Sequence, residues 1–483
     1  MKQKSILLLC VLLPLAALAQ KIENFNAKGD QFTRFSTAGD AIDAHDGEIA
    51  RFNGVYYLYG TSYDCGFAWG KKGAPFCGFK VYTSTDLQTW TDKGALFDAS
   101  TQVWQTRCNG NTYGCFRPHV VYNQRTSRYV LWINVYDNVS GYRVFTSKSP
   151  VGPFVEVKEP VVAVNANAPA AGLNNGDHDL FIDDDGSCYL AYTDWRAKGT
   201  IVIEKLTDDY LSGTGEHVKA VTPGNTEAPG LFKRKGKYYV TYSDPNCGYC
   251  SGTGTSYRTA SSPLGPWSEG IKISDNSCGG QPSFVSAFKL GKDSIYLYGS
   301  DLWNNAAKNE ALANYYWTVL EFTEDGAIKP LKCNPSPVKG YRLQCDISRN
   351  IQRSQSFKAA RNGTLKAIQL TSFKNTDPDS ALVVAIYAAD ASFKPTGQPL
   401  AVSKVEEGKI GWSAKGIRCK FSLKLQKGKS YCMVISTNAS AGCYGVAYND
   451  DGISKGVQAY SKDNGKVFEE EKGRSLKYEL EWR

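Results

Sequence analysis

Methionine, histidine and long apolar runs are all scarce in this sequence. Only 2 of its 483 residues are Met and 4 are His, and charged residues make up 21%. So few charges beside 42% hydrophobic residues exclude a disordered scaffold, a coiled coil and a collagen-like rod. Beyond the first twenty residues, no stretch approaches the ~18 apolar residues of a membrane span. We therefore expect a folded protein with no membrane span.

Aromatic residues are abundant by contrast. They make up 12% of the chain, with 29 Tyr and 10 Trp, and such side chains are enriched in strands. No long stretch keeps a helical period. The composition therefore favours an all-β protein, and at about 100 to 200 residues per domain the length predicts two or three domains.

The N-terminus carries the pattern of an export signal. Lys2 and Lys4 precede an apolar run that ends in a small-residue Ala-Leu-Ala just before Gln20. This pattern predicts a signal peptide over residues 1–19 and an exported protein, periplasmic or extracellular. Its removal takes the formal charge from +9 to +7, and without basic runs that surplus does not favour nucleic acid as a partner. The sequence leaves the oligomeric state open.

Thirteen of the 14 Cys follow the signal peptide, so at least one thiol should stay unpaired within the chain. Two local pairs would each close a short loop: Cys65 with Cys77, and Cys108 with Cys115. The spacing of Cys247 and Cys250 fits a metal site, a redox disulfide or a plain loop staple. Because no second Cys or His pair lies nearby, we expect the staple.

A turn followed by a short aromatic and β-branched run occurs five times in the first 330 residues. The runs are Tyr56–Tyr59, Tyr129–Trp132, Tyr189–Tyr192, Tyr238–Tyr242 and Ile295–Tyr298. Their spacing is typical of propeller blades with extended loops. From about residue 340 the period is lost, and alternating runs indicate a separate β-sandwich. We therefore predict a five-bladed β-propeller over residues 20–335, followed by a C-terminal β-sandwich domain over residues 336–483.

Polar residues precede each aromatic run, where the innermost strand of each blade should begin. The five openings are His45-Asp46-Gly47-Glu48, Phe116-Arg117-Pro118-His119, Asp177-His178-Asp179, Glu227-Ala228-Pro229 and Gln281-Pro282-Ser283. Innermost strands line the central channel of a propeller, so these openings should converge. Three of them carry a carboxylate in their first two positions, and like charges in a partly buried channel are unfavourable.

Two interpretations fit such carboxylates. They could cap turns or bind a structural cation. In a catalytic constellation, one carboxylic acid with a raised pKa protonates a leaving oxygen, one carboxylate activates water, and the third tunes the pKa of the acid.

These motifs resemble glycoside hydrolase family 43. Asp46 resembles the Asp of the family's first-blade Asp-Pro-Ser opening, Asp177 looks like its third-blade carboxylate, and Glu227-Ala228-Pro229 is similar to its Glu-Gly-Pro. The resemblance covers roughly residues 40–333. It implies an inverting glycosidase with Asp46 as general base, Asp177 as pKa modulator and Glu227 as general acid. It implies no required cofactor, with room for a structural calcium or sodium ion in the channel.

The sequence also departs from the family pattern. Gly47 and His178 stand where the family has Pro, so Glu48 and Asp179 are rival candidates, since a shift of two residues keeps the same strand face. Gln281 stands where the family often has a His that contacts a channel ion.

Some residues are similar to the exo-β-1,3-galactanase branch of that family: Gln281, Ala44-His45 and the run Arg117–Asn123. That branch, however, has Gly in place of Asp46 and Glu in place of Phe116. The resemblance therefore implies a neighbour of the branch with another sugar or linkage, galactofuranosides and arabinofuranosides leading.

Further residues are candidates for binding the substrate. At the strand openings these are His45, Phe116, Arg117, His119, His178 and Gln281. In loops that leave the second strands, Trp69, Trp195 and Trp303 are expected to stack on apolar sugar faces, with packing as the alternative. Three His near one channel allow a metal triad, but their spacing matches no zinc motif, and we assign no metal ligand.

We therefore expect an exported, exo-acting, inverting hydrolase of complex polysaccharides or oligosaccharides. It would release terminal galactofuranosyl, arabinofuranosyl or β-galactosyl units, because long loops over residues 60–78 and 100–115 would close one end of the channel. A non-catalytic glycan-binding propeller and an endo-arabinanase are the alternatives. The last domain would be accessory, bracing the propeller or binding carbohydrate.

Overall fold

The structure is a computed structural model of the chain. It describes residues 22–67, 73–108, 114–136, 140–164, 175–247, 250, 252–290, 293–303, 309–334, 340–450 and 456–483. The predicted signal peptide and Trp69 lie outside the described residues. Strands dominate the described residues, which confirms the all-β class, and no helix among them is long and apolar enough to cross a membrane.

Five antiparallel sheets follow one another along the N-terminal part that the structure describes, each with its strands in chain order. The first sheet holds β1 (His45–Phe52), β2 (Val55–Thr61), β3 (Phe79–Ser84) and β4 (Thr91–Ala95). The second holds β5 (Cys115–Asn123), β6 (Arg128–Val135), β7 (Tyr142–Ser147) and β8 (Val155–Lys158). The third holds β9 (Asn175–Ile182), β10 (Cys188–Asp194), β11 (Thr200–Leu206) and β12 (Gly213–Val218). The fourth holds β13 (Glu227–Arg234), β14 (Lys237–Ser243), β15 (Thr255–Ala260) and β16 (Ile271–Ser274). The fifth holds β17 (Gln281–Leu290), β18 (Asp293–Leu302) and β19 (Asn314–Val319).

The repeat in the sequence corresponds to the second strand of each sheet: the five aromatic runs lie in β2, β6, β10, β14 and β18. The hairpin between β1 and β2 turns at Asn53 and Gly54, whose φ angles of 49° and 84° fit the turn that such hairpins favour. Short helical turns occur between strands: Trp104–Cys108, Trp195–Ala197, Ser277–Gly279, Glu310–Leu312 and, further on, Glu407–Lys409.

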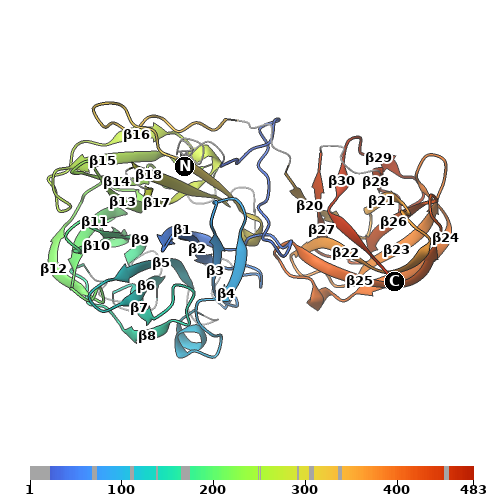
Figure 1. Cartoon of the computed structure of the whole chain (residues 1–483), viewed down its shortest axis with the longest axis horizontal. Helices are drawn as coiled ribbons and strands as arrows, with labels where there is room; N and C mark the ends of the chain where they lie inside the picture. The colour runs from blue at the N-terminus through green and yellow to red at the C-terminus, as the bar shows by residue number, and fades with distance from the viewer. Residues whose placement is uncertain are drawn as a thin grey trace, which may run out of the picture.

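The five first strands form the inside of a ring. β1 contacts β5, β5 contacts β9, β9 contacts β13, β13 contacts β17, and β17 contacts β1 again. Figure 1 shows the five sheets around a common centre with these strands innermost. The first residues of the five strands therefore gather at one place, as the sequence predicted.

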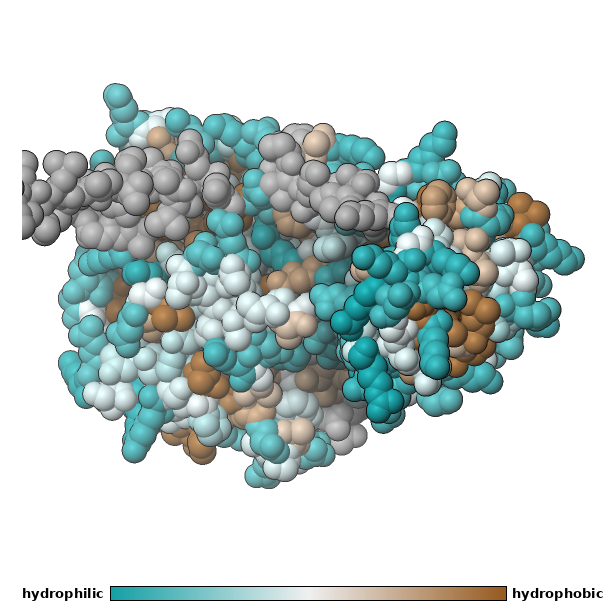
Figure 2. Space-filling model, turned by 45° about the vertical axis from the view of Figure 1, so that its right-hand side comes forward, coloured by the Kyte–Doolittle hydropathy of each residue, from teal (hydrophilic) through white to brown (hydrophobic). Residues whose placement is uncertain are grey.

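The C-terminal part has two six-stranded sheets over a core of its own. One contains β20 (Arg342–Ile347), β27 (Cys443–Asn449), β22 (Gly363–Asn375), β25 (Lys415–Leu425), β30 (Ser475–Leu476) and β31 (Tyr478–Trp482). The other contains β24 (Pro395–Val405), β23 (Leu382–Ala389), β26 (Ser430–Thr437), β21 (Gln352–Lys358), β28 (Gln458–Ser461) and β29 (Glu469–Glu470). Apolar residues of both sheets, such as Ile368 of β22 and Ile386 of β23, are fully buried in that core. Hydrophilic residues cover much of both parts on the face shown in Figure 2.

A short loop of the C-terminal part docks against the segment that follows β2. Asp64 accepts a hydrogen bond from the backbone N–H of Ser413 at 2.7 Å and pairs with the ammonium of Lys415. Gly66 leaves room for the indole of Trp412, because a Cβ at this position would lie 2.7 Å from its Cε2 atom. The C-terminal part therefore holds the loop between β2 and β3 in place.

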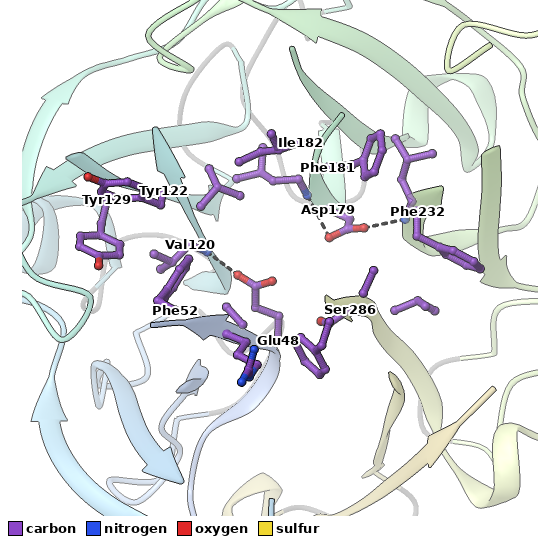
Figure 3. A pocket seen from close by; sticks show the side chains of 18 of the residues that line it. Glu48, Phe52, Val120, Tyr122, Tyr129, Asp179, Phe181, Ile182, Phe232 and Ser286 are labelled. Carbon is purple, nitrogen blue, oxygen red and sulfur yellow. Dashed lines mark hydrogen bonds between the residues drawn. The ribbon is translucent and has the colours of Figure 1, made fainter. Parts of the chain in front are cut away.

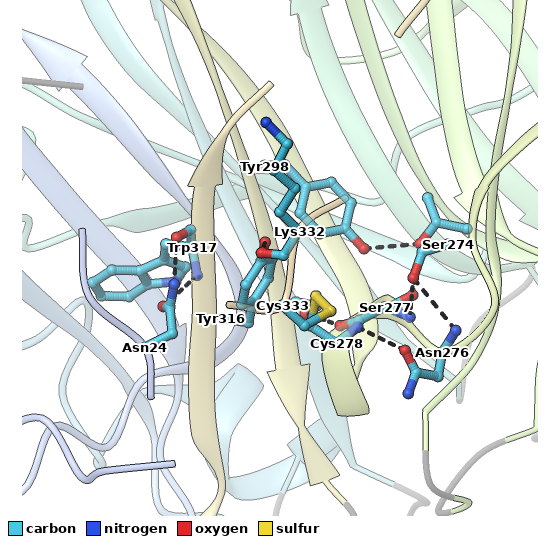
Figure 4. Close-up of a disulfide and its surroundings, with 12 residues drawn as sticks. Asn24, Ser274, Asn276, Ser277, Cys278, Tyr298, Tyr316, Trp317, Lys332 and Cys333 are labelled. Carbon is cyan, nitrogen blue, oxygen red and sulfur yellow. Dashed lines mark hydrogen bonds between the residues drawn. A yellow bond between two sulfur atoms is a disulfide. The ribbon is translucent and has the colours of Figure 1, made fainter. Parts of the chain in front are cut away.

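Five disulfides fasten the described chain: Cys65–Cys77, Cys108–Cys115, Cys247–Cys250, Cys278–Cys333 and Cys345–Cys443. The three expected bridges are thus confirmed, and three buried Cys remain unpaired: Cys188, Cys419 and Cys432. Figure 4 shows the Cys278–Cys333 bridge and, nearby, Asn24, whose side chain bonds the backbone N–H and C=O of Trp317 in β19. The N-terminal segment therefore covers the outer edge of the three-stranded fifth sheet.

Candidate active site

Backbone irregularities mark the beginnings of the innermost strands. The pairing of β1, β5 and β13 with their second strands shifts register within the first five residues. In these bulges Asp46, Arg117 and Ala228 have φ angles of 56°, 53° and 55°. Non-glycine residues rarely adopt such angles, and bulges re-aim side chains next to active sites. Two of these bulges bring Asp46 and Arg117 into contact, since the backbone N–H of Arg117 donates to the carboxylate of Asp46.

Arg117 joins two of the expected carboxylates. Its Nε donates to Asp177 Oδ1 at 2.7 Å, and its backbone N–H donates to Asp46 Oδ1 at 3.1 Å. Its terminal nitrogens donate to the carbonyls of Ser283 and Pro282 at 3.1 and 3.4 Å. Burial opposes the charge of the guanidinium, but the neighbouring Asp177 and Asp46 raise the pKa of Arg117 above its usual value. The cation at the centre of the cluster is therefore permanent.

Asp46 is held by two hydroxyl groups from the end of β2 and the loop after it. Thr61 donates to its Oδ1 at 2.7 Å and Tyr63 to its Oδ2 at 2.9 Å. Burial raises the pKa of Asp46 to about 7, although the charge of Arg117 and these two hydrogen bonds oppose the rise. Asp46 is therefore an oriented carboxyl group that changes charge near neutral pH.

Glu227 is the first residue of β13 and is only 8% exposed. The side-chain amide of Gln281 donates to its Oε1, and its backbone N–H and C=O both bond the hydroxyl of Ser243, at 3.0 and 3.1 Å. Burial raises the pKa of Glu227 well above its usual value, and the charge of Asp177 raises it further. Glu227 therefore keeps a proton that an ordinary Glu would lose.

The structure thus brings Asp46, Asp177 and Glu227 together around Arg117. The side chain of Asp177 is 14% exposed, and Asp46 and Glu227 are 6% and 8% exposed, so all three are largely removed from water. Two carboxyl groups with raised pKa values beside a third that is paired with Arg form an arrangement suited to moving protons at neutral pH.

The rival carboxylates lie in a different cluster. Glu48 and Asp179 line a cavity of about 510 Å³ further along the central channel, together with aromatic residues of the innermost strands (Figure 3). A step of two residues keeps the strand face but moves a side chain about 7 Å along the strand. The catalytic carboxylates expected from the family motifs and their rivals therefore occupy separate layers of the ring.

Among the residues that the structure describes, Glu48, His119 and Asp179 could hold a metal ion, since their ligand atoms lie within 4.8 Å of one another. Both carboxylates already accept hydrogen bonds from backbone amides: Glu48 from Val120, and Asp179 from Leu231 at 2.6 Å. Burial raises the pKa of Asp179 to about 7 and lowers the pKa of His119 to about 3. The imidazole of this cluster is therefore neutral.

The three His expected to contact substrate are completely buried. His45 stacks on Tyr315 with ring centroids 4.9 Å apart, and its Nε2 lies 3.4 Å from Asp43 Oδ1. Burial opposes its charge, but neighbouring carboxylates raise the pKa of His45 to about 9. His119 and His178 pack against each other with centroids 5.1 Å apart. These side chains pack inside the ring and present no exposed atom to a sugar.

The aromatic candidates are also more buried than expected. Phe116 is 6% exposed and stacks on Phe67, and Trp303 is 8% exposed. Trp195 is partly exposed and lies over Gly176, where a Cβ would come within 2.6 Å of its Nε1 atom. Among the described candidates, Trp195 and Gln281 keep partial exposure. The candidate Trp69 lies outside the described residues.

Sequence reasoning gave no role to several residues of the cluster. Thr61 is paired with His45 across β1 and β2, so antiparallel register alone would have placed it beside Asp46. Asp301 accepts hydrogen bonds from the backbone N–H of Asp46 at 3.1 Å and from the hydroxyl of Ser283. Its signal in the sequence is an Asp at or just after the end of the second strand, which also occurs in other sheets, as at Asp194 in β10 and Asp244 after β14.

This ring with convergent carboxyl groups is an arrangement suited to acid–base catalysis. A family model for the glycosyl hydrolases of family 43 matches residues 41–280. The chain belongs to glycoside hydrolase family 43 and is an enzyme that hydrolyses O-glycosyl bonds.

Curated relatives and solved structures agree with this family. The β-D-galactofuranosidase xynD of Aspergillus niger is 28% identical over 311 residues, which cover 62% of this chain and 85% of that protein. The arabinoxylan arabinofuranohydrolase of Bacillus subtilis is 26% identical over 266 residues, covering 47% of this chain and 49% of that one.

Two solved structures share the fold. A family 43 β-1,3-galactosidase, solved with galactodeoxynojirimycin, has a TM-score of 0.51 and 24% identity, covering 62% of this chain and 96% of its own. An exo-β-1,3-galactanase from Clostridium thermocellum has a TM-score of 0.52 and 18% identity, covering 95% and 96%.

Proposed function

We propose that the protein is an exported, inverting, exo-acting glycoside hydrolase that removes terminal furanosyl or galactosyl units from complex polysaccharides. Galactofuranosides and arabinofuranosides are the leading substrates, in line with the activities for which the curated relatives are named. The observation that carries the proposal is the assembly of Asp46, Asp177 and Glu227 around Arg117. Five disulfides support export, because they persist in oxidising compartments.

We further propose that the five sheets form a five-bladed β-propeller and that the two C-terminal sheets form a β-sandwich. The proposed domains are residues 20–335 and 336–483, and the main hydrophobic cores of the two parts support this division. The proposed signal peptide is residues 1–19.

In the proposed reaction, Glu227 and Asp46 move one proton each. Glu227 gives its proton to the leaving oxygen as the bond from that oxygen to the anomeric carbon breaks. A water attacks the anomeric carbon from the opposite face, and Asp46 takes the proton that this water loses. Burial raises the pKa of Glu227, and Asp177, fixed by Arg117, supplies negative charge that raises it further. The product therefore has the inverted anomeric configuration.

We propose that this reaction needs no cofactor. Arg117 offsets part of the negative charge of Asp46 and Asp177, and both proton transfers use side chains of the chain itself. Glu48, His119 and Asp179 are the residues that would hold a structural calcium or sodium ion in the channel. No step of the proposed reaction passes through them.

Product analysis tests the proposed function. The enzyme would be incubated with nitrophenyl furanosides and pyranosides and with arabinogalactan, and the first anomer released from a β-galactofuranoside would be followed by proton NMR. We expect α-galactofuranose to appear first and only monosaccharide to leave the polymer. A first product with retained configuration would contradict inversion, and oligosaccharide products would contradict exo action. Binding of the glycan without turnover would support the alternative of a non-catalytic glycan-binding protein.

We also propose that the C-terminal part braces the site, because Asp64 lies next to Tyr63, which holds Asp46. Replacing Asp64 with Ala removes the partners of Ser413 and Lys415 and should cost about 1 to 3 kcal/mol of unfolding free energy. Turnover should fall as well, because the loop that carries Tyr63 is loosened. Calorimetry and initial rates would measure both effects.

The matched control is Asp92→Ala, which removes an ion pair with Lys80 within the first sheet. It should leave turnover unchanged, since Asp92 touches neither the C-terminal part nor the site. Equal turnover in the Asp64 and Asp92 variants would contradict the bracing role.

A further inference from the structure

Gln281 and Trp303 were expected to bind the sugar, but the structure places them in a hydrogen-bonded series that ends on Glu227. The indole Nε1 of Trp303 donates to Gln281 Oε1 at 3.1 Å, and Gln281 Nε2 donates to Glu227 Oε1. Gln281 opens β17, and its strand partner Asp301 lies two residues before Trp303, so the fold of the fifth sheet brings the two side chains together.

This series has one direction only. An indole N–H can donate but not accept, so the carboxamide of Gln281 must turn its oxygen to Trp303. Its NH₂ group then faces Glu227, and this group can only donate. Oε1 of Glu227 is therefore the acceptor in this bond, and when Glu227 is protonated the proton is favoured on its other oxygen, Oε2, because a carbonyl oxygen accepts better than a hydroxyl oxygen.

We propose that Trp303 and Gln281 are positioning residues that fix which oxygen of Glu227 carries the proton given to the leaving group. The inference rests on the proposed role of Glu227 as the general acid. If the amide of Gln281 could turn around, its oxygen would accept a hydrogen bond from protonated Glu227 and would hold the proton away from the glycosidic oxygen. Trp303 prevents that turn.

The surroundings of Trp303 agree with this role rather than with stacking on a sugar. Its ring is 8% exposed and packs against His45 and Tyr63, with centroids 5.6 and 5.7 Å apart. Tyr63 in turn donates to Asp46 at 2.9 Å. The indole is therefore fixed from behind, with its N–H directed at Gln281.

The rates on two substrates with different leaving groups distinguish a misplaced proton on Glu227 from general damage to the active site. From a 2,4-dinitrophenyl glycoside, dinitrophenolate can leave without being protonated. From an alkyl glycoside of the same sugar, the leaving oxygen must be protonated by the general acid. Trp303→Phe keeps a ring but removes the N–H. We expect kcat on the alkyl substrate to fall about tenfold, part of the ~10²- to 10⁴-fold that a general acid contributes, with KM and the dinitrophenyl rate nearly unchanged.

Gln281→Met is the second variant, since it keeps the length of the side chain and removes the donor. It should show the same selective loss on the alkyl substrate. The alkaline limb of its pH profile should also move to higher pH, because the hydrogen bond from Gln281 lowers the pKa of Glu227. Trp90→Phe, which changes an indole packed against Trp317 away from the site, is the control and should behave as wild type.

The outcomes separate this inference from the proposed function. Equal losses on both substrates, or a rise in KM alone, in the two variants would overturn the inference and leave Gln281 as a sugar contact. A selective loss in Glu227→Gln without one in Trp303→Phe and Gln281→Met would remove the positioning role and keep Glu227 as the acid. Full activity of Glu227→Gln on the alkyl substrate would remove the proposed acid itself.

Discussion

Replacing Glu227 with Gln is expected to slow hydrolysis of alkyl glycosides by about 10²- to 10⁴-fold, the usual contribution of a general acid. The variant keeps the size of the side chain and an oxygen that can accept from Gln281, but it has no proton to give at neutral pH. The rate on a 2,4-dinitrophenyl glycoside should fall far less, because that leaving group needs no protonation. Steady-state rates on the two substrates would measure the difference.

The pH profile gives a second readout of the same change. Burial and the charge of Asp177 raise the pKa of Glu227, so the wild type should lose activity at high pH as this group loses its proton. The alkaline limb should be absent from Glu227→Gln. Glu269→Gln, at a side chain that is 99% exposed, is the matched control and should retain the wild-type profile. An alkaline limb that persists in Glu227→Gln would assign it to another group.

Asp46→Asn is expected to have an effect of similar size, about 10²- to 10⁴-fold, on both kinds of leaving group. The attacking water needs a base whichever group departs, and an amide cannot take its proton. The amide oxygen can still accept from one of the two hydroxyls, and the other hydroxyl can turn to accept from the amide NH₂, so the fold should survive. Rates on both substrates and the melting temperature would be compared with those of the wild type.

The activity that depends on Asp46 is lost at low pH, whereas the activity that depends on Glu227 is lost at high pH. A general base works when ionised, which for Asp46 means above its raised pKa of about 7. Wild-type kcat/KM should therefore fall as the pH drops through this range, and Asp46→Asn should lack that acid limb. Asp92→Asn, in the outer strand β4, is the control. If the rate fell only on substrates with poor leaving groups, Asp46 would assist the general acid and would not be the general base.

The periodic parts of the fold were accessible from the sequence. Each aromatic run marks the second strand of a sheet, because alternating aromatic and β-branched residues suit a buried strand between two others. The residues ten to fourteen positions earlier then had to open the first strands. This reasoning was sufficient to bring Asp46, Asp177 and Glu227 to one place.

The directions of the side chains at the strand openings could not be predicted from the sequence in the same way. The bulges at Asp46 and Arg117 change which side chains face the channel, and no local signal in the sequence marks them. His45 and His119, next to or near these bulges, were expected at the substrate and are fully buried. Bulges depend on contacts between strands that are distant in sequence, which a linear pattern does not contain.

The links among polar side chains were also hidden. Gln281 and Trp303 both occurred among the predicted site residues, but as separate sugar contacts. Their bond to each other depends on the pairing of β17 with β18, and their bond to Glu227 on the neighbouring position of β13 in the ring. The separation of these residues along the chain predicts neither of the two hydrogen bonds.

The C-terminal part of this enzyme cannot simply be removed or exchanged. Its residues Trp412 and Lys415 dock onto the loop at Asp64 and Gly66. A chain cut at residue 335 would leave the face at Gly66 bare and the carboxylate of Asp64 without its ammonium partner. Grafting the C-terminal sheets of another protein would require the same indole and ammonium at the same places. The two halves of the gene are therefore expected to diverge together, as one evolutionary unit.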